Sequence, residues 1–416
     1  YNADVFMNPI WSGDTVYHEA AMFADTTDGV EYKTKTLLYP IDDVISIRNA
    51  ERNVWYVKGV DYKIEDGKLV WLEKGNIPIY KGAFTVPQSQ SSVAAWYTTD
   101  NENGLIDISD AKHEDYTVYV TYTHSKTWRE YDYSNGYTPE APQNQSEDMK
   151  PFYDKLATDN DINVLVYGDS TATGLSSTGA KINYDLFDEN NNVMTRSEGS
   201  SIKAPTFFEQ ATAELVKKYG NNNNINYYNL ALAGKGTTWG AANLNARITA
   251  MNTHCGRAIT PDIIYIKFAA NDIRVNASDY KANMESMVSI FKELYPNAVI
   301  VLVSGKINNE KCIMYKDYHD NFMNLEYALS QIANATTNCI VAKNTSVWAE
   351  IVKSKNHEDF ISNNINHAND FWGMITAQVI VAASEKPITT NGLTTMYNDA
   401  AAQGYTLCVC SGYRTY

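Results

Sequence analysis

The chain has 416 residues, of which 49 are Asp or Glu and 34 are Lys or Arg, giving a formal net charge of −15 at pH 7. This acidic balance argues against a nucleic-acid partner, because phosphate binding needs clustered Lys and Arg. A length of 416 residues predicts two or more domains, and no stretch approaches the ~18 apolar residues of a membrane span.

Residues 1–135 show short strand patterns separated by turn residues. Asn53–Ile64 and Lys68–Leu72 flank a Glu-Asp-Gly turn, which predicts a hairpin. Tyr116–Thr123 alternates aromatic residues with Val and Thr, as a strand does. We expect a β-sandwich or jelly-roll-like accessory domain. The sequence does not decide whether this domain binds sugars or only packs beside a catalytic domain.

Composition changes after this region. Ser134–Pro151 is polar and contains three prolines, so residues 136–151 are predicted to be a linker. From residue 152 to residue 385, apolar runs alternate with helix-length segments, which predicts an α/β domain. Its expected architecture is a three-layer α/β/α sandwich with a parallel, flavodoxin-like sheet. The predicted strands are Asn163–Tyr167, Asn226–Leu230, Ile263–Phe268, Ala298–Val303 and Cys339–Ala342, and the predicted helices are Pro205–Tyr219, Tyr280–Tyr295, Tyr318–Asn334 and Asp370–Ala383.

The first predicted strand of this domain ends in Gly168-Asp169-Ser170. A serine in a tight turn at the carboxyl end of a buried strand lies where open α/β sheets place their ligands. Its hydroxyl becomes a nucleophile if a base reaches it. The alternative is that Ser170 only caps the next segment, because Asp and Ser are common at helix starts.

Two further strands end in polar or glycine-rich segments. One runs from Asn229 into a glycine loop in which Gly234 exposes its backbone N–H. The other ends in Asn271 and Asp272. Because the carboxyl ends of parallel strands converge on one crevice, these groups are expected near Ser170, where they would act as oxyanion donors.

A base is needed to activate the serine. Of the seven histidines, His367 lies in a polar loop just before the last predicted helix of the α/β domain. That position allows it to reach back over the edge of the sheet. A single histidine is also commonly a satisfied packing or surface residue.

These segments together resemble the GDSL-type serine esterases, the SGNH hydrolase family. The family's four blocks match, in order, Gly168-Asp169-Ser170, Asn229 and Gly234, Asn271 and Asp272, and His367. The resemblance covers about residues 160–385. It implies that Ser170 is the nucleophile, that Ser170, Gly234 and Asn271 form the oxyanion hole, and that His367 is the base.

The chain departs from the family pattern at two positions. Ala269 replaces a glycine of the third block, which is a small change. Asn364 stands three residues before His367, where the family has Asp. A Ser–His dyad is therefore expected, with the imidazole held by Asn364, by a backbone carbonyl, or by a nearby carboxylate of Asp359 or Asp370.

The resemblance implies hydrolysis of an ester through an acyl-enzyme, with no metal or organic cofactor. The β region, which opens with NPIWSGDTVYHEA, also resembles the accessory domains that precede such modules in bacterial carbohydrate esterases, and this resemblance implies removal of acetyl groups from a polysaccharide. We therefore expect a secreted or cell-surface bacterial protein, although the first residues show no signal peptide. An apolar lid, which a lipase would need, is absent from the polar loop Ser176–Ser200.

Residues 386–416 are predicted to form a C-terminal segment that starts a further module. Within it, Asn391–Tyr416 resembles the entry segment of VanY-type D-Ala-D-Ala carboxypeptidases, without the later zinc ligands, and this resemblance implies a peptidoglycan-type substrate. The alternative is a chance match. The five cysteines, Cys255, Cys312, Cys339, Cys408 and Cys410, have no zinc-binding spacing and are expected to be buried or free thiols.

A second function class remains open. A carbohydrate-binding or wall-anchoring protein whose hydrolase fold has lost activity would also explain the missing Asp near His367. Retention of Ser170, Gly234, Asn271 and His367 together favours the enzyme.

Overall fold

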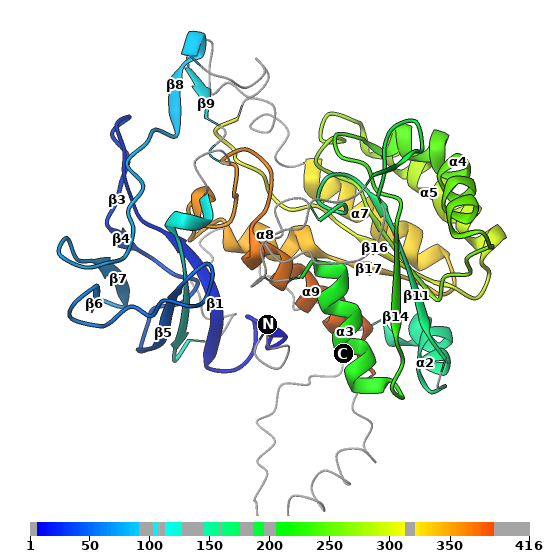
Figure 1. The fold of residues 1–416 in the computed structure, drawn as a ribbon, viewed down its shortest axis with the longest axis horizontal. Helices are drawn as coiled ribbons and strands as arrows, with labels where there is room; N and C mark the ends of the chain where they lie inside the picture. Colours follow the sequence, from blue (N-terminus) through cyan, green and yellow to red (C-terminus); the bar gives the residue numbers. More distant parts are fainter. Residues whose placement is uncertain are drawn as a thin grey trace, which may run out of the picture.

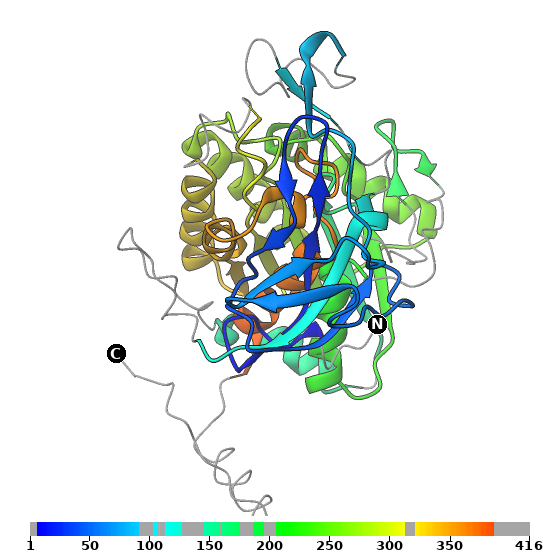
Figure 2. The ribbon, with the colours of Figure 1, turned by 90° about the vertical axis from the view of Figure 1, so that its left-hand side faces the viewer.

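A computed structural model of the protein describes residues 6–90, 103–106, 108, 113–126, 145–158, 160–174, 186–194, 205–312 and 321–386. Figure 1 shows an N-terminal region of short strands, in blue to cyan, beside an α/β region in green to orange. In Figure 2 the N-terminal strands face the viewer and the α/β region lies behind them. Within the described ranges, no helix is long and apolar enough to cross a membrane.

The α/β region contains a five-stranded parallel sheet, as predicted. Its spatial order is β14-β11-β15-β16-β17, and every neighbouring pair is parallel. The chain leaves β11 to one side and returns on its other side, so the switch point lies between β11 and β15. Ligands of such sheets bind outside the carboxyl ends of the strands at this point. The strands are β11 (Ile162–Gly168), β14 (Ile225–Asn229), β15 (Ile263–Lys267), β16 (Val299–Val303) and β17 (Cys339–Ala342).

Alternation along the strands divides the apolar side chains between two cores. Val164 and Val166 of β11 face one core, and Leu165 and Tyr167 face the other. The first core also contains α2 (Lys150–Leu156), α3 (Phe207–Tyr219), α8 (Asn344–Ile351) and α9 (Asp370–Ser384). The second contains α4 (Thr237–Cys255), α5 (Ala277–Leu294) and α7 (Asn321–Ala335). The expected α/β/α layering is therefore present.

Helices α3, α5, α7 and α9 lie where the sequence predicts helices, within a few residues at each end. Helix α3 begins at a capping box, in which the Glu209 carboxylate accepts hydrogen bonds from the Thr206 N–H and hydroxyl at 2.7 and 2.6 Å. Helix α4 was not predicted. Its sequence is rich in Asn and Thr and has almost no amphipathic pattern, so the periodicity that reveals the other helices is missing.

The N-terminal region is built from antiparallel strands. One sheet has the order β1-β10-β5 and another the order β4-β7-β6. The predicted hairpin forms between β6 and β7, with Asp66 and Gly67 both at positive φ in its turn. A sandwich of two facing sheets remains a prediction. The strands are β1 (Thr15–Met22), β2 (Ala24–Asp25), β3 (Glu31–Tyr32), β4 (Thr34–Lys35), β5 (Asp43–Asn49), β6 (Tyr62–Glu65), β7 (Lys68–Trp71), β8 (Thr85–Pro87), β9 (Asn103–Leu105) and β10 (Thr117–Thr123).

The two regions share one apolar core. The cluster on the α9 side of the sheet continues into Phe6, Ile10 and the β1–β10 pair. At the end of the predicted linker, Gln145 forms two hydrogen bonds with the Val341 backbone of β17, at 2.8 and 2.9 Å. Residues 146–149 then form the short helix η4. This end of the linker is thus packed against the sheet.

Some expectations fall on residues that the structure does not describe. The VanY-like segment, Cys408 and Cys410 lie outside the described residues, as do residues 127–144 of the region around the linker. Among the described residues, Cys255, Cys312 and Cys339 form no disulfide bond.

Candidate active site

The first block ends β11 at a point where only glycine fits. A Cβ atom on Gly168 would lie 2.1 Å from the backbone oxygen of Lys267 on β15. The next residue, Asp169, donates its N–H to the same Lys267 oxygen at 3.0 Å. The turn therefore begins where β11 lies too close to β15 for a side chain, and a larger residue at position 168 would force the strands apart.

Ser170 stands in the tight turn that follows. The Asp169 oxygen accepts the N–H groups of Ala172 and Thr173 at 3.1 Å each, and the Thr173 hydroxyl donates to the Ser170 oxygen at 2.6 Å. Ser170 is 6% exposed. Neither its hydroxyl nor its N–H bonds to any residue that the structure describes. A nucleophile and an oxyanion donor both need such free groups.

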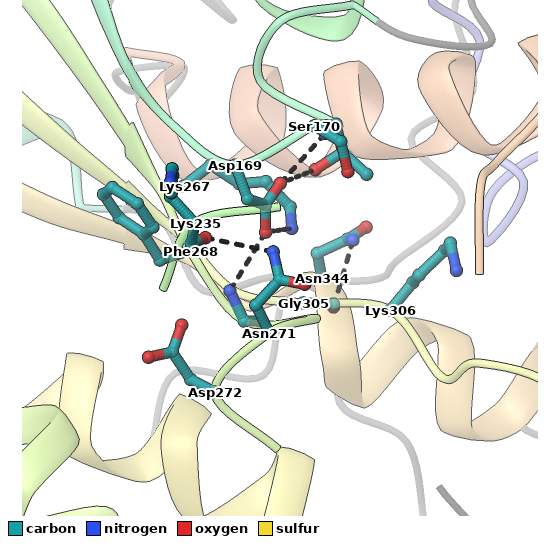
Figure 3. A network of polar contacts seen from close by, with 12 residues as sticks. Asp169, Ser170, Lys235, Lys267, Phe268, Asn271, Asp272, Gly305, Lys306 and Asn344 are labelled. Atoms are coloured by element: carbon teal, nitrogen blue, oxygen red, sulfur yellow. Dashed lines mark hydrogen bonds and ion pairs between the residues drawn. The ribbon is translucent and has the colours of Figure 1, made fainter. Parts of the chain in front are cut away.

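The Asp169 carboxylate holds this turn to β15 rather than facing substrate. It is fully buried and accepts the Thr171 N–H at 2.9 Å and the Ala269 N–H at 3.2 Å. The buried Lys267 ammonium lies 3.4 Å away. Burial alone would raise the pKa of Asp169, but the Lys267 charge and these hydrogen bonds bring that pKa below its usual value. Figure 3 shows this carboxylate between the Ser170 turn and the segment of Asn271.

The second block is tied to the same turn. The Asn229 amide, at the end of β14, donates to the Ala172 oxygen at 2.8 Å, and its oxygen accepts the Ala231 N–H at 2.9 Å. Asn229 therefore fixes the start of the glycine loop relative to Ser170. Within that loop Gly234 has a φ of +76° and lies exposed. Its N–H bonds to no residue in the described ranges.

The third block fastens the glycine loop to β15. The Asn271 amide donates to the Lys235 oxygen at 3.0 Å. The Asp272 carboxylate accepts the Thr237 N–H and hydroxyl at 2.7 and 2.6 Å, and so caps α4. Burial raises the pKa of Asp272 to about 6. Its second oxygen has no partner among the described residues.

His367 lies in a closed loop between η5 (His357–Asp359) and α9. Ile361 and Ala368 pair across the base of this loop, and the Ser362 N–H donates to the His367 oxygen at 2.8 Å. Every residue of 357–380 is buried except His367, which is half-buried. The fold thus buries the loop but leaves His367 partly exposed.

The imidazole is contacted by Asn363, which sequence reasoning did not identify. The Asn363 amide nitrogen lies 3.3 Å from His367 Nδ1. The Asn363 oxygen accepts the backbone N–H groups of residues 365, 366 and 367 at 3.1, 2.9 and 2.8 Å, which fixes the orientation of the amide. The amide therefore donates towards Nδ1, which favours the neutral tautomer that carries its proton on Nε2.

The three residues expected to hold His367 contact the N-terminal region. The Asn364 amide donates to the Phe84 and Ile106 oxygens at 2.9 and 3.1 Å. The Asp359 carboxylate lies 2.8 Å from the Lys35 ammonium, and Asp370 lies 3.6 Å from the Arg52 guanidinium. These side chains anchor the ends and the tip of the loop.

The His367 loop and the Ser170 turn lie at the same edge of the sheet. Asn309, in the segment after β16, donates its amide to the Asn364 oxygen at 2.7 Å and its N–H to the Ile365 oxygen at 3.1 Å. Gly305 of the same segment packs against Ala269 at the end of β15. No hydrogen bond joins the Ser170 hydroxyl to His367 in the described structure, although such bonds often tighten only when substrate binds.

Two buried lysines, Lys267 and Lys306, lie at this edge of the sheet. Lys267 lies inside an apolar strand, and that position was a visible signal, since a buried charge needs a partner. Lys306, directly after Gly305, is 3% exposed and donates to the Asn308 side chain. Burial, and then the charge of Lys267, hold the pKa of Lys306 well below its usual value. Nothing in the local sequence indicates that Lys306 is buried.

A cavity of about 930 Å³ lies where the two regions meet, away from Ser170. Asp28, Phe84, Thr85 and Asn103 line it from the N-terminal side, and Glu310 and Lys311 line it from the segment after β16. No group of three or more His, Cys, Asp and Glu residues within the described ranges is arranged to hold a metal ion.

No family model matches the sequence, and no curated protein matches it. Among solved structures, the chain is similar to a GDSL-like lipase from Parabacteroides merdae, with 16% identity, a TM-score of 0.39, and coverage of 55% of this chain and 98% of the other. An acetylxylan esterase from Geobacillus stearothermophilus gives 16% identity, a TM-score of 0.38, and coverage of 55% and 96%. A two-domain esterase active on acetylated mannans gives 15% identity, a TM-score of 0.37, and coverage of 64% and 57%. At such scores the likeness decides neither fold nor activity.

Proposed function

We propose that this protein is a serine esterase of the GDSL type that removes acyl groups, in particular acetyl groups, from a carbohydrate or cell-wall glycan. One observation supports this most strongly. Among the described residues, the Ser170 hydroxyl and N–H have no hydrogen-bond partner. The Asp169 carboxylate accepts a hydrogen bond from the Ala269 N–H, and the Asn229 amide donates one to the Ala172 oxygen, so the turn is tied to the ends of the neighbouring strands. A capping serine would use its hydroxyl on the following backbone.

In the proposed reaction the Ser170 hydroxyl attacks the ester carbonyl and passes its proton to His367. The bond between Ser170 Oγ and the acyl carbon forms, the bond to the alcohol oxygen breaks, and the proton moves from His367 to the leaving alcohol. Water then attacks the acyl carbon while His367 takes its proton. The bond between Ser170 Oγ and the acyl carbon breaks, the proton passes from His367 to Ser170, and the carboxylic acid leaves. The N–H groups of Ser170 and Gly234 and the Asn271 amide would stabilise the oxyanion.

The substrate is proposed to be a neutral or peptide-bearing glycan. A chain with a net charge of −15 repels strongly acidic polymers. A peptidoglycan-type substrate rests only on the sequence of the carboxyl end, and acetylated plant polysaccharide is the other choice. Both substrates lie outside the cell, so we propose that the protein is secreted or displayed on the cell surface.

One observation favours a second function, a glycan-binding protein with weak or no catalysis. With the Asn363 amide donating towards His367 Nδ1, the neutral imidazole keeps its proton on Nε2. A triad aspartate enforces the opposite tautomer, in which Nε2 accepts the proton of the serine. The described contact therefore opposes the protonation state that catalysis needs.

Two assays distinguish the two functions. The first measures hydrolysis of p-nitrophenyl acetate, and the second measures acetate release from acetylated xylan and O-acetylated peptidoglycan. The esterase predicts activity that disappears in Ser170→Ala. Equal low rates in the wild type and the variant, together with retained affinity for one of these polymers, would support the binding protein.

A further inference from the structure

The segment that carries His367 is held between the two regions. It runs from Lys355 to the start of α9, and its helix η5 contacts β1. In Figure 1 this segment, drawn in orange, lies between the N-terminal strands and the α/β region, and Figure 2 shows it behind those strands. Its surroundings therefore come from both parts of the chain.

The start of the segment is anchored by buried charges. The Lys355 ammonium donates to the Glu19 carboxylate and to the Ala20 oxygen, each at 2.7 Å. The Asp359 carboxylate accepts the Met22 N–H at 2.8 Å and pairs with Lys35 at 2.8 Å. Without the N-terminal region, these buried charges of the His367 segment would lose their partners.

The tip of the loop is anchored by Asn364. Its φ of +65° is a backbone conformation that Asn and Gly tolerate better than other residues. This conformation directs the amide away from the His367 ring contact and onto the Phe84 and Ile106 oxygens, at 2.9 and 3.1 Å. Phe84 and Ile106 flank the β8–β9 pair, so the tip is attached to a different part of the N-terminal region than the start.

The end of the segment is anchored at α9. The Asp370 carboxylate faces the Arg52 guanidinium at 3.6 Å. Further along α9, the Gln378 amide donates to the Phe6 and Asn8 oxygens at 2.7 and 2.8 Å. Three attachments, at the start, tip and end, thus surround the only partly exposed residue of the loop, His367.

We propose that the N-terminal β region is a working part of the active site, because it positions His367 through these anchors, and that Asn364 is a positioning residue. The proposal rests on the proposed function, in which His367 is the base. It differs from the family pattern, in which the residue three positions before the histidine bonds to the imidazole itself.

Asn364→Asp tests this directly, because the two accounts predict opposite results. An aspartate of the same size tolerates the same φ but has no amide to donate to the two carbonyl oxygens. If Asn364 anchors the loop, kcat for p-nitrophenyl acetate falls about tenfold to a hundredfold, as for a displacement of about 1 Å in a catalytic group. KM stays within about twofold. If the residue instead orients the imidazole, the new carboxylate raises kcat, which would overturn the proposal.

Asn364→Gly is the second variant, because it keeps the positive φ and only removes the amide. It is expected to lower kcat in the same way as Asn364→Asp, and an unchanged kcat would contradict the proposal. Asn223→Ala is the matched control. The Asn223 amide also donates to two backbone oxygens, of Thr158 and Asn160, at 2.6 and 2.7 Å, but at the opposite edge of the sheet. Its kcat should equal that of the wild type.

Backbone hydrogen exchange tests the anchoring of the loop without relying on esterase activity. In Asn364→Gly, backbone exchange should rise in residues 357–369 and stay unchanged in β11 and β15. If Ser170→Ala keeps full activity, the esterase proposal fails, and the exchange result still decides whether the N-terminal region anchors the loop. Unchanged exchange in residues 357–369 would overturn the anchoring.

Discussion

The Ser170 turn and the His367 loop lie at the same edge of the sheet, but different parts of the chain hold them. The turn is fixed by Lys267 on β15 and by Asn229 on β14, both within the central sheet. The loop is fixed by residues of the N-terminal region, through Asp359 and Asn364. The proposed nucleophile is therefore built into the α/β fold, whereas the proposed base depends on a second region packed beside it.

This difference predicts which variants change the stability of the protein and which change its catalytic rate. Substitutions that disturb the turn should change the stability of the whole α/β region, because they act on the central strands. Substitutions that disturb the loop should change the rate while the sheet stays intact. Four predictions test this division.

Asp169→Asn should have the largest effect. The variant leaves the buried Lys267 ammonium without a counter-charge and turns an amide donor towards the Ala269 N–H or the Lys267 ammonium. Removing one partner of a buried ion pair costs about 3–5 kcal/mol, so the free energy of unfolding should fall by that amount. Urea denaturation followed by circular dichroism measures it.

The exposed pair of Lys150 and Asp154, 2.6 Å apart, supplies the control for that experiment. Asp154→Asn should cost less than about 1 kcal/mol, because surface pairs contribute little. If the two variants lose the same free energy, Asp169 does not hold the turn to β15.

Asp272→Asn tests a second buried carboxyl group. Its pKa is raised, whereas that of Asp169 is lowered. The pKa of Asp272 rises from 3.8 to about 6 on burial, so the folded protein binds more protons than the unfolded chain between these values. The contribution of Asp272 to wild-type stability should therefore fall as the pH rises from about 4 to about 6, by up to about 3 kcal/mol, and the variant lacks this contribution.

To test this, the free energy of unfolding of the variant and of the wild type is measured at pH 4.5 and at pH 7.5. The contributions of the other titrating groups cancel in the difference between the two proteins. The difference should shift in favour of the variant at the higher pH. A shift in favour of the wild type would mean that Asp272 is ionised and stabilising, as Asp169 is.

Asn363→Asp should raise the rate. The new carboxylate keeps accepting the three backbone N–H groups, and its second oxygen takes the place of the amide nitrogen 3.3 Å from His367 Nδ1. The imidazole would then carry its proton on Nδ1 and accept the Ser170 proton at Nε2. Because the reverse change in a serine protease costs about 10⁴-fold, we expect kcat to rise at least about tenfold. Initial rates with p-nitrophenyl acetate at neutral pH measure this.

The same substitution one residue later, Asn364→Asp, is the matched comparison and should lower kcat. A higher rate in Asn364→Asp and a lower rate in Asn363→Asp would contradict the assignment of roles to these two residues.

Gly234→Ala should have the smallest effect. The φ of +76° makes an alanine unfavourable by about 1–2 kcal/mol, but no atom lies within 4 Å of the new Cβ. The backbone N–H is kept, so kcat should change by less than about tenfold, below the cost of losing an oxyanion donor. Thermal denaturation and steady-state rates check both parts. A loss of a hundredfold or more in kcat with the fold intact would show that the side chain blocks the crevice.

The parallel sheet was predictable from sequence because four of its strands, β11, β15, β16 and β17, are short apolar runs, whereas β14 contains two asparagines. The Ser170 turn was predictable for the same reason, since the residues that shape it are close to the strand ends. Helix α4 was missed because its Asn- and Thr-rich sequence lacks an apolar face, and its start is fixed by Asp272, 35 residues later in the chain.

The surroundings of His367 were not predictable in the same way. Asn364 has the spacing of a family position, but its positive φ directs the amide to Phe84 and Ile106, while Asn363 meets the imidazole. The pairs of Lys355 with Glu19 and of Asp359 with Lys35 join residues more than 300 positions apart. Local sequence patterns cannot show that two such regions share buried charges, so the sequence indicated a separate accessory domain.

The central claim, that Ser170 is the nucleophile of an esterase, is tested most directly by trapping its acyl-enzyme. The wild type is mixed with p-nitrophenyl acetate and quenched in acid, and the protein mass and its peptides are then measured. We predict one added acetyl group, located on Ser170 and absent from Ser170→Ala. Substrate turnover without an adduct on Ser170, or an adduct on another residue that persists in Ser170→Ala, would contradict the account.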